Sequence, residues 1–314
     1  MALVHHPPVP PRAFPPARTV LVPDRGEFFL RDSGLILRDS GLSAGDGARQ
    51  AQEGAPAVLM LHGWVGSADL NFGALYEDVV AAGHRVLALD HRGHGRGLRH
   101  TAPFRLQDCA ADAAAVVRTL GVGPVIVYGY SMGGAIAQLI AREHADIVAG
   151  MVLSGTAQHW REPELRRAWR SMPLLGLALA LAPVRGWRLA LRRSGVPSVP
   201  QTAWVHAEMI RHSPAAIAQA GAELGRFDSR PWLGRLSFPT AMVLTSVDDA
   251  VPPAKQRELA QATGARVFEA PVRHLEVAAM AGEDAASRYN PVLLQALDWV
   301  RASVASGSLV GREP

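Results

Sequence analysis

The sequence predicts an α/β protein, with a mainly parallel sheet covered by helices and a helical cap inserted past the middle of the chain. Two observations lead to this fold class. Six short apolar segments recur along the chain, and helical patterns lie between them, as is typical of a parallel sheet that is buried on both faces. The interval 157–236 interrupts this alternation, because it is rich in Arg, Leu, Ala and Trp and contains no clear strand.

The first seventeen residues are rich in proline, and we expect an extended, poorly ordered arm at 1–17. This stretch lacks the apolar run of a secretion signal, and its prolines would break a membrane helix, so we expect a cytoplasmic protein. Residues 19–34 then predict two short strands around a Pro-Asp-Arg-Gly turn. The pentapeptide RDSGL occurs at 31–35 and again at 38–42, which we interpret as a local duplication that leads into a flexible loop.

The remaining elements follow from apolar periodicity and from the Gly, Pro and Asp residues that bound each segment. We expect the sheet core at 18–156 and 237–306, the cap at 157–236 and a flexible tail at 307–314. The expected strands are 57–61, 85–89, 124–128, 151–154, 241–246 and 265–270, and the expected helices are 68–82, 106–120, 132–144, 254–262 and 291–305.

Charge and cysteine content exclude several classes of function. The formal charge is +4, and the basic residues, nearly all arginine, are spread along a chain with only 6% aromatic residues. Binding of nucleic acid would need a basic stripe interleaved with aromatic side chains, so it is disfavoured. The single cysteine, Cys109, rules out an intramolecular disulfide or a multi-cysteine metal site, and we expect a buried structural thiol there.

The most apolar stretch is 173–184, PLLGLALALAPV, between Arg170 and Arg185. It is too short for a transmembrane segment, which needs about twenty residues. A buried or cap helix is favoured, and an interfacial helix in a lipid headgroup layer stays open, since arginines flank the segment. The arginine-rich helical patterns around it are typical of a solvated face, with contact to acidic or lipid partners as the alternative.

The strongest chemical motif is Gly129-Tyr130-Ser131-Met132-Gly133, which lies between a predicted strand and a predicted helix. In that context G-x-S-x-G indicates a nucleophile elbow, whose two glycines remove side chains that would collide in a sharp turn. The serine is then held in a strained conformation at the N-terminus of the following helix. Ser131 is therefore the candidate nucleophile.

A serine nucleophile needs a general base that is oriented by a carboxylate, and both are found downstream. The strand 241–246 runs into a loop with Asp248 and Asp249, and the D-x-x-V-P spacing favours Asp248 as the acid. His274 follows the last predicted strand, and its place in the chain order selects it from twelve histidines as the base.

Leu61-His62-Gly63-Trp64 directly follows the first parallel strand. A glycine at this point lets the backbone turn its N–H groups toward the site, so we expect the oxyanion hole to use the backbone N–H groups of Trp64 and Met132. His62 is expected to hold the loop by hydrogen bonding, and the Trp64 ring to form a wall of the substrate pocket.

These residues resemble the α/β-hydrolase superfamily over about 19–305. The order Ser131, Asp248, His274, the His-Gly-Trp loop and the segment DHRGHG at 90–95 all look like that family. Together with GYSMGG and the end of the cap at 226–233, they look most like capped, actinobacterial-type serine esterases or lipases. The resemblance implies an α/β-hydrolase fold and a small-molecule ester or acyl substrate. It implies no cofactor and no metal, and the histidines around DHRGHG have no clustered carboxylates to complete a metal site.

The function indicated is hydrolysis of carboxylic esters through an acyl-enzyme, with a hydrophobic acyl group suggested by the apolar cap and its tryptophans. Epoxide hydrolases and haloalkane dehalogenases use an aspartate at the elbow, so Ser131 argues against both. Carbon–carbon bond hydrolases, lactonases, thioesterases and perhydrolases share the serine machinery and stay open. The alternative to an enzyme is a non-catalytic module of the same fold that binds a hydrophobic ligand. This alternative is disfavoured, because the set of catalytic residues is complete.

Overall fold

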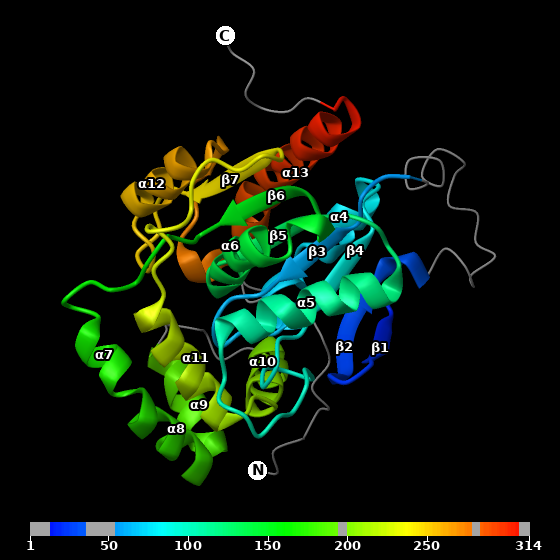
Figure 1. Ribbon diagram of the computed structural model, residues 1–314. Helices are drawn as coiled ribbons and strands as arrows, with labels where there is room; N and C mark the ends of the chain where they lie inside the picture. The colour runs from blue at the N-terminus through cyan, green and yellow to red at the C-terminus, as the bar shows by residue number, and fades with distance from the viewer. Residues whose placement is uncertain (1–12, 36–53, 194–199, 278–282, 308–314) are drawn as a thin grey trace.

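The computed structural model describes residues 13–35, 54–193, 200–277 and 283–307. Its centre is a twisted eight-stranded sheet in the order β1-β2-β4-β3-β5-β6-β7-β8 (Figure 1). The first two strands form an antiparallel hairpin, and β3 to β8 run parallel. The strands are β1 (Ala17–Val22), β2 (Gly26–Asp32), β3 (Val58–Leu61), β4 (Val86–Leu89), β5 (Val125–Tyr130), β6 (Val148–Ser154), β7 (Thr240–Thr245) and β8 (Arg266–Ala270).

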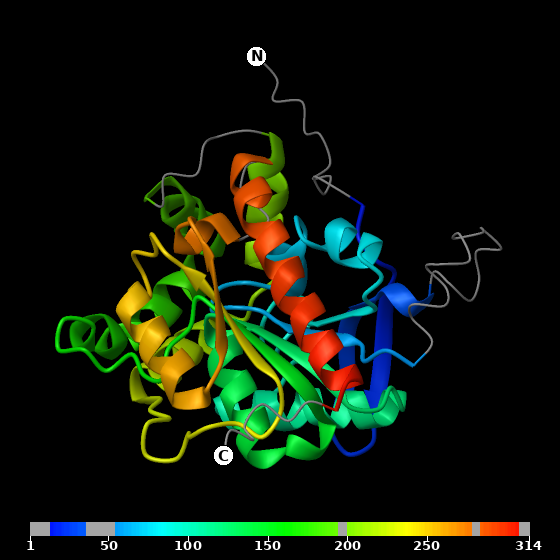
Figure 2. The same cartoon turned by 90° about the horizontal axis from the view of Figure 1, so that it is seen from above.

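Helices cover both faces of the sheet, as the sequence predicts (Figure 2). One apolar core lies against α5 (Leu106–Leu120), α6 (Met132–Glu143) and α12 (Pro253–Thr263), and a second lies against α4 (Tyr76–Ala81) and α13 (Glu283–Ala305). Neighbouring residues of one strand enter opposite cores, because successive side chains point to opposite faces. Along β3, Leu59 and Leu61 belong to the first core, and Val58 and Met60 to the second.

Several boundaries differ from the sequence prediction, and β6 begins at Val148, three residues before the predicted start of its strand at 151. Phe14 packs against the rings of Tyr76 and Trp204, so the chain is already packed before the predicted end of the arm at residue 17. The predicted helix 68–82 is two helices, α3 (Ala68–Phe72) and α4, separated by Gly73 and two further residues. The rest of the predicted arm and tail, and the second RDSGL copy, lie outside the described residues.

The C-terminal helix begins at Glu283 instead of 291, so Pro291 lies inside it. Proline lacks the N–H that continues the helix, which is why the sequence places a helix start there. The residues just before it are held by tertiary contacts. The Tyr289 hydroxyl donates to Ser154 Oγ and shares a hydrogen bond with Tyr128, and Asn290 Nδ2 donates to the Ala74 carbonyl. These contacts stabilise helix on both sides of the proline.

The interval between β6 and β7 is helical, as predicted, and lies beyond the carboxyl ends of the parallel strands (Figure 1). None of the described helices is long and apolar enough to cross a bilayer. The segment contains α7 (Arg166–Arg170), α8 (Met172–Leu181), α9 (Pro183–Arg193), α10 (Pro200–Ile210) and α11 (Pro214–Arg226).

Buried polar contacts attach these helices to the loop after β4. Both guanidinium N–H groups of Arg96 donate to the Glu208 carboxylate at 2.7 Å. The Gly95 N–H donates to His212 Nδ1 at 2.9 Å, and the Ser213 N–H donates to the Gly93 carbonyl. The motif DHRGHG and the residue after it therefore form one attachment point of the inserted helices.

Candidate active site

The sharp turn between β5 and α6 presents Ser131. This residue has φ 54° and ψ −118°, a left-handed conformation that is strained for a side chain with a Cβ. The turn is possible because its glycines have no side chains. A Cβ on Gly133 would overlap the carbonyl of Leu61, and one on Gly129 would lie 2.5 Å from the Gly133 carbonyl oxygen. The local sequence thus dictates the turn that exposes the serine hydroxyl.

The structure brings Ser131, His274 and Asp248 together in one chain of hydrogen bonds. His274 Nε2 lies 3.0 Å from Ser131 Oγ, and His274 Nδ1 lies 2.9 Å from Asp248 Oδ2. The His274 side chain is 12% exposed and that of Asp248 is fully buried. Asp249, the alternative acid, is exposed. A hydroxyl, an imidazole and a carboxylate in this order can move a proton away from the serine.

The carboxylate of Asp248 is held from both sides. Its Oδ2 also accepts from the Thr245 hydroxyl at 2.6 Å, and its Oδ1 accepts from two backbone N–H groups of the following turn at 2.8 Å each. Burial alone would raise the pKa of Asp248, but the hydrogen bond and charge of His274 and these donors lower it below the usual value. The carboxylate therefore stays charged beside the imidazole.

Two residues that sequence reasoning did not find position this chain. Gln256 Nε2 donates to Thr245 Oγ1 at 2.7 Å, so the threonine hydroxyl must point its own proton at Asp248. The Tyr130 hydroxyl donates to the carbonyl of His274, which fixes the backbone of the histidine loop. No local sequence motif contains both Gln256 and Thr245, or both Tyr130 and His274. Only the position of Tyr130 inside G-x-S-x-G could have drawn attention to it.

The loop after β3 lies beside the serine. A Cβ on Gly63 would lie 3.1 Å from Ser131 Cβ, so any side chain here would crowd the serine. The Gly63 N–H donates to Asn71 Oδ1 at 2.8 Å, which turns this group away from the site. Trp64 is the next residue, and its N–H makes no hydrogen bond within the described part of the chain. Met132 is the first residue of α6, where backbone N–H groups lack a helical acceptor.

His62 is completely buried and holds this loop. Its Nε2 accepts from the His91 N–H at 3.1 Å, so the ring proton is on Nδ1, which faces the Gly63 carbonyl at 2.8 Å. Burial, together with the neighbouring His91, lowers the pKa of His62 well below its usual value. A neutral imidazole with both nitrogens bonded to the backbone has no proton to exchange with a substrate.

The Trp64 side chain connects the loop to the inserted helices. Its Nε1 donates to the carbonyl of Ile217 on α11 at 2.9 Å, and its ring lies 5.7 Å from that of Trp169. These two half-buried indoles form an apolar wall that starts one residue after Gly63, the residue beside Ser131. Other tryptophans that suggested an acyl pocket are packed inside the molecule instead, namely Trp160, Trp187 and Trp204.

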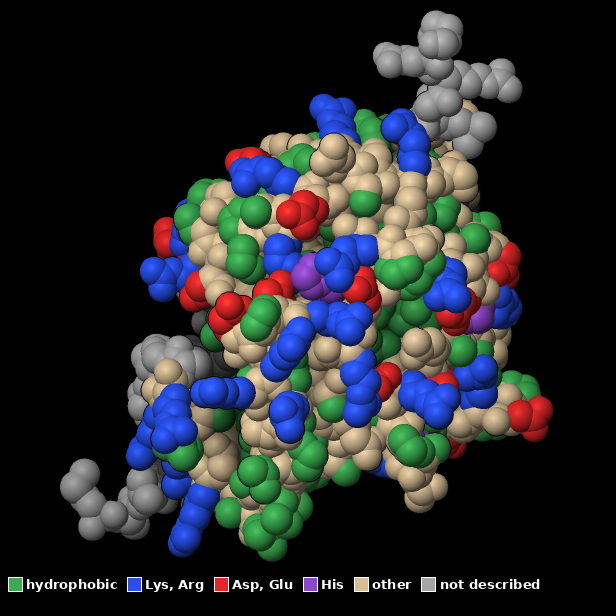
Figure 3. All heavy atoms as spheres, turned by 60° about the vertical axis from the view of Figure 1, so that its left-hand side comes forward, with side chains coloured by type: hydrophobic (Ala, Val, Ile, Leu, Met, Phe, Trp, Pro, Cys, Tyr) green, Lys and Arg blue, Asp and Glu red, His purple; other side chains and the backbone are tan. Residues whose placement is uncertain are grey.

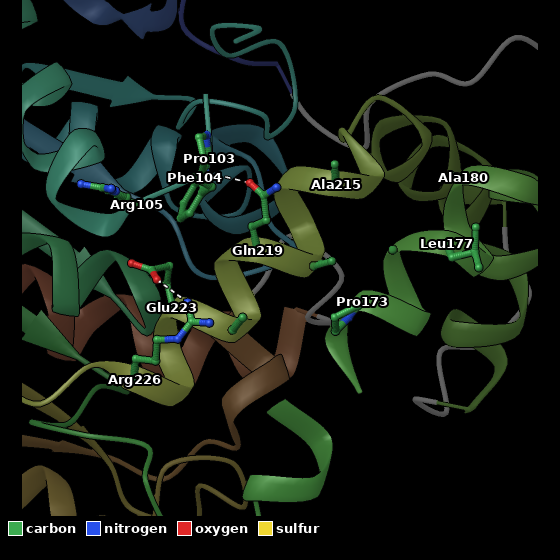
Figure 4. Close-up of a pocket in the computed structure, with 13 residues that line it drawn as sticks. Pro103, Phe104, Arg105, Pro173, Leu177, Ala180, Ala215, Gln219, Glu223 and Arg226 are labelled. Carbon is green, nitrogen blue, oxygen red and sulfur yellow. Dashed lines mark hydrogen bonds and ion pairs between the residues drawn. The ribbon is translucent and has the colours of Figure 1, made fainter. Parts of the chain in front are cut away.

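A groove of about 720 Å³ lies between α11, α8 and residues 103–105 (Figure 4). Helix α11 turns Ile217 and Gly221 toward Trp64, and it turns Ala218, Gln219 and Ala222 into the groove. None of the three residues of the hydrogen-bond chain lines it. The groove is therefore a separate feature of the inserted helices.

Two curated proteins show how far the sequence resembles known relatives. The chain is 40% identical over 99 residues to a non-heme haloperoxidase of Rhodococcus erythropolis, covering 31% of this chain and 36% of that protein. It is 30% identical over 215 residues to a pimeloyl-[acyl-carrier protein] methyl ester esterase of Chromobacterium violaceum, covering 66% and 81%. Matches to several curated relatives, the haloperoxidase included, span only about a third of their length.

The fold also matches solved structures. A thermophilic esterase from Thermogutta terrifontis superimposes with a TM-score of 0.67 at 22% identity, over 91% of this chain and 99% of that one. The model of the alpha/beta hydrolase fold family matches residues 56–277, which include the elbow, the loop after β3 and the histidine loop. The chain belongs to the α/β-hydrolase fold family.

Proposed function

We propose that the chain hydrolyses carboxylic esters with a Ser131-His274-Asp248 triad. The observation that carries the proposal is the unbroken hydrogen-bond chain from the strained serine hydroxyl to the buried carboxylate. The esterases among the relatives support the ester as substrate class. A non-catalytic module would have no need to keep Ser131 in a costly backbone conformation.

The proposed reaction has two halves. His274 Nε2 takes the proton of Ser131 as Oγ attacks the ester carbonyl, and Asp248 stabilises the imidazolium that forms. The tetrahedral oxyanion accepts hydrogen bonds from the backbone N–H groups of Trp64 and Met132. The imidazolium then gives its proton to the departing alcohol. A water molecule repeats the same steps on the acyl-enzyme, which releases the acid and restores the serine.

We infer a hydrophobic acyl group, and with it a capped serine esterase of the kind that the motifs resemble. The half-buried Trp64 and Trp169 rings support this inference. Met172 supports it as well, because its sulfur and the Trp64 ring both pack against Gly221 of α11. The helices α7 to α11 then act as a cap, and α11 bounds the pocket.

The test is hydrolysis of p-nitrophenyl esters from acetate to palmitate by wild type and by Ser131→Ala. We expect one preferred chain length in wild type and a loss of turnover of at least about 10³-fold in the variant. Ser287→Ala, an exposed serine on α13, is the matched control and keeps full activity. A fluorophosphonate should label Ser131. Near-full activity of Ser131→Ala, or a label elsewhere, would refute the assignment.

A further inference from the structure

Helix α8 presents an apolar face to solvent. Leu174, Leu177 and Leu181 are 71%, 57% and 78% exposed, and their spacing of three and four residues places them on one side of the helix. Val184 and Leu189 of α9 are also about half exposed. Figure 3 shows hydrophobic side chains gathered at the lower end of the molecule, with arginines beside them. An apolar patch of this kind on a folded surface marks an interaction site.

The same part of the chain carries an unbalanced positive charge. Residues 166–207 contain seven arginines and no aspartate or glutamate, so this segment alone has a formal charge of +7 against +4 for the whole chain. Two of the three nearest acidic residues pair with cations outside this segment. Glu164 is exposed on the β6 side, Glu162 pairs with Lys255, and Glu208 pairs with Arg96. The rest of the molecule is therefore net negative, and the positive charge is concentrated on the inserted helices.

Helix α9 brings charge and apolar surface together. Trp187 and Leu191 are buried against the molecule, whereas Arg185, Arg188 and Arg192 are exposed. The leucine face of α8 and these arginines of α9 form one surface, which we call the α8–α9 face. Leucines between arginines, with no carboxylate among them, have the composition of a helix that lies in the headgroup layer of a membrane.

The groove beside α8 extends this apolar surface inward. It runs between α8 and α11 and is closed on a third side by residues 103–105 (Figure 4). Leu177 and Ala180 line the groove and are themselves exposed, so it opens at the edge of the leucine face. At its other end lie Arg105 and the ion pair between Arg226 and Glu223.

We propose that the α8–α9 face binds the surface of an anionic lipid bilayer. The leucines enter the boundary between headgroups and acyl chains, and the arginines contact lipid phosphates. A second copy of the chain fits this face poorly, because an isologous contact would bring two sets of arginines together. An anionic bilayer offers the apolar and the negatively charged component at once.

The location of the face has a consequence for the substrate. Helix α8 packs on α11 where Gly176 meets Ala218, and α11 holds Trp64 through the Ile217 carbonyl. A bilayer bound to α8 is thus one helix away from the apolar wall that Trp64 and Trp169 form. Resting on the proposed function, we infer that the enzyme takes its acyl substrate from the lipid surface.

The test is flotation with vesicles of phosphatidylcholine, alone or mixed with phosphatidylglycerol. Ser131→Ala protein is used, so that binding is measured without turnover and does not depend on the proposed function. We expect binding to the anionic vesicles only. It should weaken when salt rises from about 0.1 M to about 1 M, because the screening length falls from about 10 Å to about 3 Å.

Two sets of substitutions separate the contributions. Leu174→Ser, Leu177→Ser and Leu181→Ser together should weaken vesicle binding by at least about tenfold. Arg185→Gln, Arg188→Gln and Arg192→Gln together should weaken it by about a hundredfold. The matched control replaces Leu21 and Val267 by serine. These residues are 68% and 41% exposed on β1 and β8, outside the face, and binding should not change.

In an otherwise wild-type chain, the leucine variant should keep its thermal stability and its turnover of a soluble acetate ester, which shows that it folds. Three results would overturn the proposal: no flotation of the Ser131→Ala protein, flotation that the leucine variant retains, or equal binding to neutral vesicles. A dimer that the leucine substitutions convert to a monomer, with no vesicle binding, would assign the face to a second copy instead.

Discussion

The carboxylate of Asp248 shows how much one residue of this site depends on its neighbours. Each of its oxygens accepts two hydrogen bonds, from Thr245 and His274 on one side and from the backbone of the turn on the other. The lowered pKa means that the carboxylate is ionised in the folded protein across the whole range in which an imidazole can act as base. An amide of the same shape would place an N–H₂ group against one of these donors.

We therefore predict that Asp248→Asn lowers kcat by about 10³- to 10⁴-fold, because the His274 ring is no longer held in the tautomer that can accept the serine proton. The matched control is Asp249→Asn, an exposed neighbour, which should change kcat less than twofold. Steady-state kinetics on the preferred p-nitrophenyl ester measures both. Equal losses in the two variants would show that the turn, and not the Asp248 carboxylate, matters.

The sequence could point to Ser131, Asp248 and His274 because each follows a predicted strand at the same edge of a parallel sheet. It could not point to Gln256 or Tyr130. Their hydrogen-bond partners are 11 and 144 residues away along the chain, and only the packing of β7, α12 and the histidine loop brings them together. Local motifs specify the reacting groups, whereas the residues that position them depend on tertiary structure.

At the scale of elements, strands were easier to predict than helix ends. A strand buried on both faces is apolar throughout, so its position can be read from the chain, as for 85–89 against β4, although β6 begins three residues before its predicted start at 151. Helix α13 starts eight residues before the predicted start because the contacts of Tyr289 and Asn290 outweigh the lost hydrogen bond at Pro291. Such contacts with other elements leave no trace in local periodicity.

The attachment of α10 to the loop after β4 gives a prediction at this scale. Glu208 is almost fully buried and accepts two hydrogen bonds from Arg96. Glu208→Gln leaves the guanidinium with a single charged partner, the buried Asp69 carboxylate at 3.4 Å, so we expect a loss of about 2 to 3 kcal/mol in the free energy of unfolding. Glu223→Gln on α11, whose partner Arg226 is largely exposed, should cost at most about 1 kcal/mol.

Urea denaturation measures both changes, and hydrogen exchange followed by mass spectrometry locates them. In the Glu208 variant, protection should fall in α10 and in the 90–97 loop before it falls in the sheet. A uniform loss of protection across β3 to β8 would mean that the pair stabilises the whole fold, and that the inserted helices have no separate attachment at this point.

At the scale of the whole molecule, the buried histidines link stability to pH. Four buried histidine rings form one cluster. The ring centroids are 4.2 Å apart for His62 and His91, 5.3 Å for His62 and His94, and 5.6 Å for His94 and His212. Burial is the largest cause that lowers the pKa of each, to about 3 for His91 and for His212. The folded protein therefore keeps these rings neutral in solutions where an unfolded chain would protonate them.

The sign of the pH dependence follows from these shifts. Below about pH 6.5 the unfolded chain binds a proton at each of the four rings and the folded chain does not, so stability falls as the pH falls toward 3. Asp90 acts in the opposite direction. Burial raises its pKa to about 7, so the folded chain keeps a proton that the unfolded chain loses above about pH 4. Four histidines outweigh one aspartate, and the net result is loss of stability in acid.

We predict that the free energy of unfolding falls by at least about 1.4 kcal/mol for each pH unit between pH 6 and pH 4.5, measured by urea denaturation. His91 is the best residue to replace, because neither ring nitrogen bonds to a described protein group. His91→Leu should reduce the slope by about 1.4 kcal/mol per pH unit, and Asp90→Asn should increase it by a similar amount. Slopes that change in the same direction in both variants would contradict the assignment of opposite signs. An unchanged slope in His91→Leu would mean that this ring is already protonated in the folded protein.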